Sequence, residues 1–132
     1  MPEEKGLVLA TGKRKSSKAT VKIIQGNGQV FVNGIPLASY FQRLAHRRHA
    51  IYPLVATETL SKFNVWMVVH GGGPTGQSGA IHSAVSRALR IQNALLEGPL
   101  RQAGCVENDK RKVERKKTGQ PKARKKYTWV KR

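Results

Sequence analysis

The chain has 132 residues, which is enough for one domain with a modest core and too few for two. Its 25 Lys and Arg residues outnumber the 7 Asp and Glu residues, so the formal net charge is +18. A chain with this charge repels itself, and we therefore expect a polyanionic partner, with nucleic acid ahead of an anionic membrane surface. A membrane is disfavoured because no apolar run approaches the roughly 20 residues that a span requires.

The first strands are predicted in the domain-like part of the chain, residues 6–104, where apolar runs alternate with glycines. Residues 20–24 and 29–32 are rich in β-branched side chains and predict two strands. Between them lies the turn Gly-Asn-Gly at residues 26–28. An Asn-Gly pair between such runs is the strongest short hairpin signal, so we expect the two strands to pair with each other.

Two short helices are predicted next. Asn-Gly at residues 33–34 predicts a turn, and Pro36 suits the first turn of a helix that continues to Phe41. A second helix is expected around residues 51–58, and Pro53 bears on where it starts because proline cannot donate a backbone hydrogen bond.

A strand, a glycine-rich loop and a long helix follow. Residues 63–69 (FNVWMVV) are almost continuously apolar, which is typical of a strand covered on both faces. Residues 71–76, here called the glycine loop, lead into a helix that runs to about Asn93. The apolar stripe that this helix would bury consists of Ile81, Ala84, Val85, Ala88 and Leu89. Together the elements predict an α+β fold, a two-layer sandwich with helices on one face of a mixed sheet.

The composition changes after Glu107, so we expect a globular domain over residues 6–107 and an extended basic tail over residues 108–132. Residues 110–132 hold 12 Lys and Arg residues and a single acid, Glu114. Such a segment cannot offset its ordering entropy by forming a core, so it should become ordered only on a polyanion.

The sequence argues against an enzyme. Glu58 is the only acid of residues 6–96, whereas general acid–base chemistry uses paired groups and glycosidases use two carboxylates. His46 and His49 have a spacing that could suit a metal, but no Cys-x-x-Cys pair accompanies them, and they more simply extend a cationic run. The single cysteine, Cys105, rules out an internal disulfide and is expected to be a core thiol. We predict no catalytic residue, metal or cofactor.

The glycine loop has two main interpretations. It follows a predicted strand and opens a predicted helix, so its backbone N–H groups and the helix dipole would face an anion. It lacks the Gly-Lys-Ser/Thr ending of a nucleoside-triphosphate loop and is not a dinucleotide fingerprint. The loop is therefore either a tight turn where backbones pack closely or a contact for an RNA phosphate backbone. A mononucleotide site is the remaining alternative.

Three clusters of cations outside the tail suit phosphates. They are residues 11–18, residues 43–49, and Arg87 with Arg90. Any one of them alone could be a solvated face, but together they favour one surface covered by a polyanion. In the tail, two aromatic residues lie among the terminal cations, where they could stack on a base or tether a neighbouring protein. They are Tyr127 and Trp129.

Three motifs carry a resemblance to a known family. Residues 11–17 (Thr-Gly-Lys-Arg-Lys-Ser-Ser) come first, and residues 71–89 follow the pattern Gly-Gly-Gly-x-x-Gly-Gln-x-x-Ala-x-x-x-Ala-x-Ser-Arg-Ala-Leu. The third motif is Val-Glu-Arg-Lys-Lys at residues 113–117, followed by Lys-Ala-Arg at 122–124 and a terminal Lys-Arg. In this order and spacing the motifs resemble those of the bacterial-type small-subunit ribosomal protein nine family.

The resemblance implies a fold like the second domain of small-subunit ribosomal protein five. It also implies binding to small-subunit ribosomal RNA in the head of the subunit, beside other small-subunit ribosomal proteins. The tail of the family threads toward the peptidyl site, where its last residues approach transfer RNA. Carried over by motif, Lys131 and Arg132 would have that role here.

Charge and motifs together give the expected contacts to ribosomal RNA, of which those in residues 43–49 rest on charge alone. The expected contacts are Lys13, Arg14, Lys15, Ser17, Lys18, Arg43, Arg47, Arg48, Gly71, Gly72, Gly73, Gln77, Arg87, Lys110, Arg111, Arg115, Lys116, Lys117, Lys122, Arg124, Lys125 and Lys126.

The last residues separate branches of the family. Bacterial members usually end Ser-Lys-Arg, whereas this chain ends Trp-Val-Lys-Arg at residues 129–132, which resembles mitochondrial members. We therefore expect a mitochondrial ribosome, with a plastid or the bacterial cytoplasm as alternatives. The rivals from other classes are a free-standing nucleic-acid-binding protein and a small phosphotransfer enzyme that uses the glycine loop.

Overall fold

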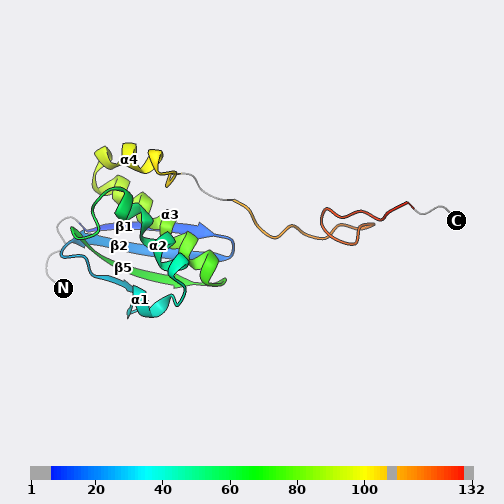
Figure 1. The fold of residues 1–132 in the computed structure, drawn as a ribbon, viewed down its shortest axis with the longest axis horizontal. Helices are drawn as coiled ribbons and strands as arrows, with labels where there is room; N and C mark the ends of the chain where they lie inside the picture. The colour runs from blue at the N-terminus through cyan, green and yellow to red at the C-terminus, as the bar shows by residue number, and fades with distance from the viewer. Residues whose placement is uncertain (1–6, 107–109, 130–132) are drawn as a thin grey trace.

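A mixed sheet of five strands forms one layer of the fold in the computed structural model, which describes residues 7–106 and 110–129 (Figure 1). The strands are β1 (Val8–Arg14), β2 (Ser17–Gln25), β3 (Val30–Val32), β4 (Ile35–Pro36) and β5 (Phe63–His70). Their order across the sheet is β1-β2-β5-β3-β4. Only β3 and β5 run parallel to each other, and every other neighbouring pair is antiparallel.

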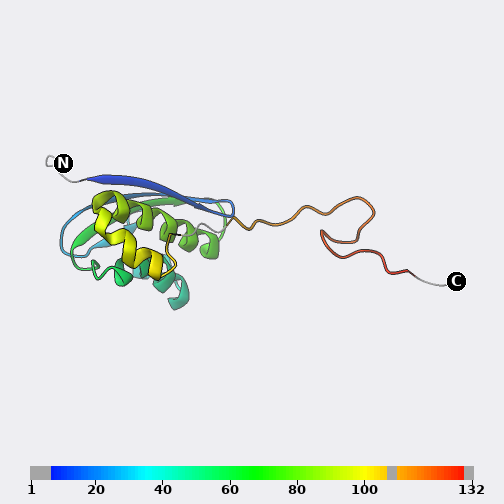
Figure 2. The same cartoon turned by 90° about the horizontal axis from the view of Figure 1, so that it is seen from above.

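The helices form the second layer, on one side of the sheet (Figures 1 and 2). They are α1 (Leu37–Tyr40), α2 (Leu44–Ala56), α3 (Pro74–Gln92) and α4 (Glu97–Gln102), with a 3₁₀ turn at Ala94–Leu96. Helix α3 packs on β1 and β2, and α2 and α4 both contact α3. This arrangement confirms the predicted α+β sandwich with helices on one face of a mixed sheet.

The predicted hairpin between residues 20–24 and 29–32 is wrong, because β5 lies between β2 and β3. The Asn64 side chain at the start of β5 explains the path of the loop. Its Oδ1 accepts hydrogen bonds from the backbone N–H groups of Asn27, Gly28 and Gln29, at 3.0 to 3.2 Å. These hydrogen bonds hold the loop at residues 27–29 against the start of β5, so the chain crosses this end of the strand before β3 begins. The hairpin of this sheet joins β1 and β2 instead, through Lys15 and Ser16.

Strand β5 is buried on one face only, which corrects the prediction that both of its faces are covered. Phe63, Val65, Met67 and Val69 are buried, whereas the side chains between them face outward. The alternation is hidden in the sequence because outward residues such as Trp66 are apolar too. Among the described residues, no helix covers this outer face of the sheet.

The core lies between the sheet and α3. The predicted stripe is confirmed, because all five of its residues are almost inaccessible to solvent, and Cys105 is a buried core thiol as expected. Burial raises the pKa of the Cys105 thiol. Strand β1 approaches α3 so closely at Gly12 that an added Cβ would lie 2.4 Å from the Ala80 carbonyl oxygen. Only glycine allows this contact between two backbones.

Helix α2 differs from its prediction, since it begins at Leu44 and ends at Ala56 with Pro53 inside its last turn. In the tail, residues 110–129 contain neither helix nor strand and extend away from the domain in both views (Figures 1 and 2). Arg14 Nη1 donates to the carbonyl oxygen of Arg111 in this segment at 3.2 Å, and further along it Arg124 forms an ion pair with Glu114 at 2.6 Å.

Candidate nucleic-acid interface

Several elements end together at one end of the sheet, which we call the loop end. The turn between β1 and β2, the last residue of β5, the glycine loop and the start of α3 all lie there (Figure 1). Strand register produces this arrangement, because Lys18 pairs with His70 immediately before the glycine loop. Two of the predicted motifs, residues 11–17 and the start of residues 71–89, are therefore neighbours in space.

The glycine loop is shaped by close packing against Ser17. Gly71 and Gly72 have φ angles of +79° and +63°, and a Cβ at Gly72 would lie 2.2 Å from Ser17 Oγ. The Ser17 side chain is only 1% exposed, and its hydroxyl donates to the Gly71 carbonyl oxygen at 2.9 Å. Ser17, expected as an RNA contact, is therefore placed to hold the loop from inside. The tight-turn interpretation thus explains Gly71 and Gly72.

Other parts of the glycine loop remain open to a ligand. Gly73 is exposed, and a Cβ added there would meet no described atom within 4 Å. The first turn of α3 contains Pro74 and no acidic side chain, so the positive end of its dipole is not compensated locally. Gln77 braces the loop: its Nε2 donates to the Gly71 carbonyl oxygen at 3.2 Å, while its Oε1 accepts from the Tyr40 hydroxyl at 2.7 Å.

A groove of about 500 Å³ opens beside the loop end, between β1, α2 and α3, and we call it the cationic groove. Its lining residues are Lys13, Arg14, His46, His49, Thr75, Ser78, Gly79, His82, Ser83, Gly104 and Arg111. The groove brings Lys13 and Arg14 together with Arg111 of the tail and with two histidines of residues 43–49, whereas the arginines of residues 43–49 and Arg87 do not line it. Sequence reasoning missed Thr75, Ser78 and His82, whose only signal was their position on the polar side of α3.

Two histidines of the cationic groove are stacked on each other. The rings of His49 and His82 are nearly parallel, with centroids 4.4 Å apart, and His82 Nδ1 donates to the His49 carbonyl oxygen at 2.9 Å. Burial lowers the pKa of both rings, and the neighbouring His82 and Arg14 lower that of His49 further. The lowered pKa favours the neutral form of the His49 ring.

The arginines of residues 43–49 differ from one another. Arg43 and Arg48 are exposed. Arg47 is half-buried, and its guanidinium donates to the carbonyl oxygens of Phe41 and Gln42 between α1 and α2. Arg47 thus fixes the start of α2, while Arg43 and Arg48 present their charges to solvent.

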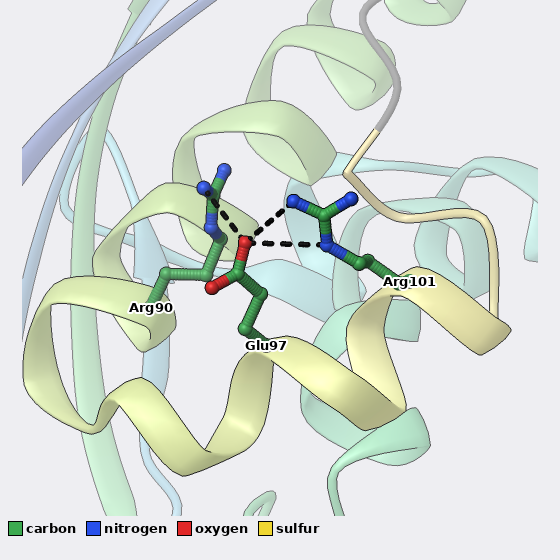
Figure 3. Close-up of polar contacts among 3 residues, drawn as sticks. All are labelled: Arg90, Glu97 and Arg101. Atoms are coloured by element: carbon green, nitrogen blue, oxygen red, sulfur yellow. Dashed lines mark hydrogen bonds and ion pairs between the residues drawn. The ribbon is translucent and has the colours of Figure 1, made fainter.

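The two arginines of the predicted third cluster, Arg87 and Arg90, differ because Arg90 forms an ion pair. Arg87 is exposed and donates to the Thr11 carbonyl oxygen at 2.8 Å. Arg90 instead contacts Glu97 Oε1 at 3.3 Å, and the same oxygen accepts from Arg101 Nη2 at 2.8 Å (Figure 3). The hydrogen bond from Arg101, and then the charges of both arginines, lower the pKa of Glu97. Arg87 therefore keeps an exposed charge, whereas that of Arg90 is compensated.

The described cations of the tail are exposed, and Arg124 is paired with Glu114. The cations predicted to contact RNA there are Lys110, Arg111, Arg115, Lys116, Lys117, Lys122, Arg124, Lys125 and Lys126. Lys131 and Arg132, predicted to contact transfer RNA, lie outside the described residues. None of the helices in the described part of the chain has the length and apolarity needed to cross a membrane.

The fold and the cations at the loop end define the class: a small basic α+β protein whose exposed charges suit a polyanion. The family described as Ribosomal protein S9/S16 matches residues 12–132, and the chain belongs to this family. Membership of a family of ribosomal proteins agrees with the prediction that the chain is not an enzyme.

Three fungal proteins named small ribosomal subunit protein uS9m are similar to the chain. The protein of Schizosaccharomyces pombe is 61% identical to the chain over all 132 residues. The protein of Neurospora crassa is 50% identical over 127 residues, and that of Candida glabrata is 47% identical over 130 residues. These alignments cover 100%, 96% and 98% of this chain, and 49%, 40% and 45% of the three relatives. The chain thus spans about half the length of the curated relatives it matches. The similarity to these proteins confirms the expectation that the chain is a mitochondrial member of the family.

Proposed function

We propose that the chain is a structural component of the small subunit of the mitochondrial ribosome. Residues 6–107 form the domain that binds small-subunit ribosomal RNA in the head, and residues 108–132 form a tail that runs along RNA toward peptidyl-site transfer RNA. Neighbouring small-subunit proteins complete its surroundings. Family membership supports this placement, together with the similarity to uS9m proteins.

The distribution of charge carries the RNA-binding part of the proposal. Glu58 and Glu97 are the only acids of residues 7–106. Glu58 follows α2 and lies near Gly28, while Glu97 follows α3, so both are at the end of the sheet opposite the loop end. Among residues 7–106, the loop end therefore presents cations without a competing carboxylate, which is the arrangement that binding to phosphates favours.

Each part of the loop end has a role in this proposal. The exposed Lys13, Lys15 and Lys18 neutralise phosphates and release counterions. Backbone N–H groups at Gly73 and the start of α3 donate hydrogen bonds to a further phosphate, because the dipole of the helix favours negative charge there. Such contacts fix the position of the protein on its RNA rather than read a base sequence.

The tail extends this binding beyond the domain. Its cations between residues 110 and 126 follow the RNA backbone, and Lys131 with Arg132 form the terminal contact to transfer RNA. Fully extended, residues 117–132 reach ~50 Å, so the tail can contact a site remote from the domain that anchors it.

Sedimentation of the full-length protein that contains this chain tests the proposal. In a gradient of mitochondrial extract at moderate salt, the protein should migrate with small ribosomal subunits. A protein that stays at the top of the gradient contradicts the ribosomal assignment, and RNA binding without subunits would favour a free-standing RNA-binding protein. Lys15→Ala should weaken the association, whereas the matched control Lys62→Ala, an exposed lysine at the opposite end, should not.

A further inference from the structure

We propose that the outer face of the sheet is a stacking platform for unpaired bases of single-stranded RNA. This inference rests on the proposed function in that it takes RNA as the partner. It concerns the side of the sheet that the helices leave uncovered (Figure 2), whereas the cationic groove opens between β1, α2 and α3. Three apolar side chains are exposed there: Trp66 (42%), Val68 (60%) and Leu9 (55%).

Strand register places aromatic and cationic side chains next to each other on this face. Trp66 on β5 pairs with Lys22 on one side and with Phe31 on the other. Leu9 continues the same row on the far side of Lys22. Neighbouring strands are about 4.8 Å apart, so the row forms a strip of apolar and aromatic surface with an ammonium group in its middle.

The charge of the face favours RNA over a protein partner. None of the five strands contains an acidic residue, and Lys13, Lys18 and Lys22 are exposed on the outer face. The cores of protein–protein interfaces are depleted in lysine, because its ammonium group loses water there without gaining a partner. Surfaces that bind single-stranded nucleic acid combine cations with aromatic rings on which bases stack.

The platform is continuous with the loop end. Lys18 and His70 pair four residues along β2 and β5 from Lys22 and Trp66, a distance of about 13 Å at the usual rise of a strand. The glycine loop follows directly after His70. A strand of RNA held by its phosphates at the loop end can thus continue along the outer face.

Unpaired nucleotides fit this surface better than a duplex does. A double helix presents phosphates and hydroxyls to a protein and keeps the faces of its bases stacked inside. The ring of Trp66 is exposed beside the half-buried Phe31, and an unstacked base can cover it whereas a base inside a duplex cannot. Sheets with such aromatics stack about two or three bases.

Fluorescence of the full-length protein tests the platform. The chain has two tryptophans, so Trp129→Phe leaves Trp66 as the only one in it. A short single-stranded RNA should quench Trp66 fluorescence on binding, whereas a duplex of equal charge should not. Trp66→Leu, which keeps an apolar side chain, should weaken single-strand binding about 5- to 100-fold, and Trp66→Phe should retain most of it. Tyr52→Leu is the matched control, since Tyr52 is equally exposed (43%) but lies on α2.

The platform would be overturned if the Trp66→Leu protein bound single-stranded RNA with wild-type affinity and if RNA did not quench the fluorescence of the Trp129→Phe protein. Loss of a neighbouring protein from subunits assembled with Trp66→Leu, at unchanged RNA affinity, would overturn it in favour of a protein docking face. These failures are separable from failure of the proposed function, because co-sedimentation with subunits and its dependence on Lys15 would persist. If the parent protein neither binds RNA nor sediments with subunits, both proposals fail.

Discussion

The ring Nδ1 of His82 donates a hydrogen bond to the carbonyl oxygen of His49, and this is the carbonyl of α2 that Pro53 leaves without its usual partner. In an α-helix the N–H of residue 53 would donate to the carbonyl oxygen of residue 49, but proline has no N–H. Since a carbonyl can only accept, the proton of His82 must be on Nδ1. A side chain of α3 thus replaces the missing bond and joins the two helices.

A double-mutant cycle measures this replacement. His82→Ala should lower the free energy of unfolding by about 1 kcal/mol, because the His49 carbonyl loses its donor. In a Pro53→Ala background the new amide can donate to the same oxygen, so His82→Ala should cost about 0.5–1 kcal/mol less. Urea unfolding of the four proteins gives the coupling. Strictly additive costs would show that His82 and Pro53 act independently.

Stability should fall as the pH is lowered from about 7 to about 5. The pKa values of His49 and His82 are lowered in the folded protein from 6.5, so the unfolded chain binds protons first and is stabilised relative to the folded state as the pH falls. Their stabilising neutral state is fully present above pH ~7.5, and each ring contributes a slope of at most ~1.4 kcal/mol per pH unit. His49→Gln should make the profile shallower. Denaturant unfolding over this range checks both, and equal stability at pH 5 and 7 would contradict the lowered pKa values.

Two neighbouring glycines should respond differently to alanine. Gly72→Ala should destabilise the fold by about 2 kcal/mol or more, because its φ of +63° is strained for alanine and its Cβ would collide with Ser17 Oγ. Gly73→Ala has open space and ordinary backbone angles, so its free energy of unfolding should change by less than about 0.5 kcal/mol. The folded Gly73→Ala protein then reports on RNA contact, since its methyl group should weaken phosphate binding at the loop.

The salt dependence of RNA binding should depend on where a lysine lies. Lys13→Ala removes an exposed charge at the loop end and should reduce the slope of log affinity against log salt by about 1. Lys62→Ala, beyond the opposite end of the sheet, should leave the slope unchanged. Affinities measured over a series of salt concentrations decide this, and equal slopes for the two variants would argue against the loop end as the interface.

Deletion of Lys131 and Arg132 should separate anchoring from positioning. Subunits containing the shortened protein should assemble normally. Their affinity for peptidyl-site transfer RNA should fall about 5- to 30-fold, because each exposed charge contact contributes roughly 0.5–1 kcal/mol. Filter binding of transfer RNA to purified subunits measures the loss. Failure of assembly would instead make the terminal residues a structural anchor.

Local signals in the sequence predict local structure well in this protein. The periodicity of residues 81–89 identifies the buried side of α3, and Pro36 marks the start of α1. The partners of the strands were not predictable in this way. The turn at residues 26–28 carries a strong hairpin signal, yet Asn64, nearly 40 residues later, directs the loop across β5. Such a non-local contact leaves no periodic trace in the sequence.

The candidate site shows the same division. Composition and motifs identified the cations around Lys13 and the glycine loop, because charge and glycine spacing are visible in one dimension. Register between β2 and β5 brings them together, and this could not be read from the sequence. His82 was missed since its role depends on the proline of another helix, and Ser17 was assigned to RNA because burial of a small hydroxyl has no sequence signature.

The separation of acids from cations has a consequence for how the protein meets its partner. With Glu58 and Glu97 at one end and the lysines of the loop end at the other, residues 7–106 carry an electric dipole along the sheet. In the field of a polyanion, such a dipole experiences a torque before any contact forms. The domain should therefore arrive with its glycine loop leading, which shortens the orientational search and makes correct docking fastest at low ionic strength.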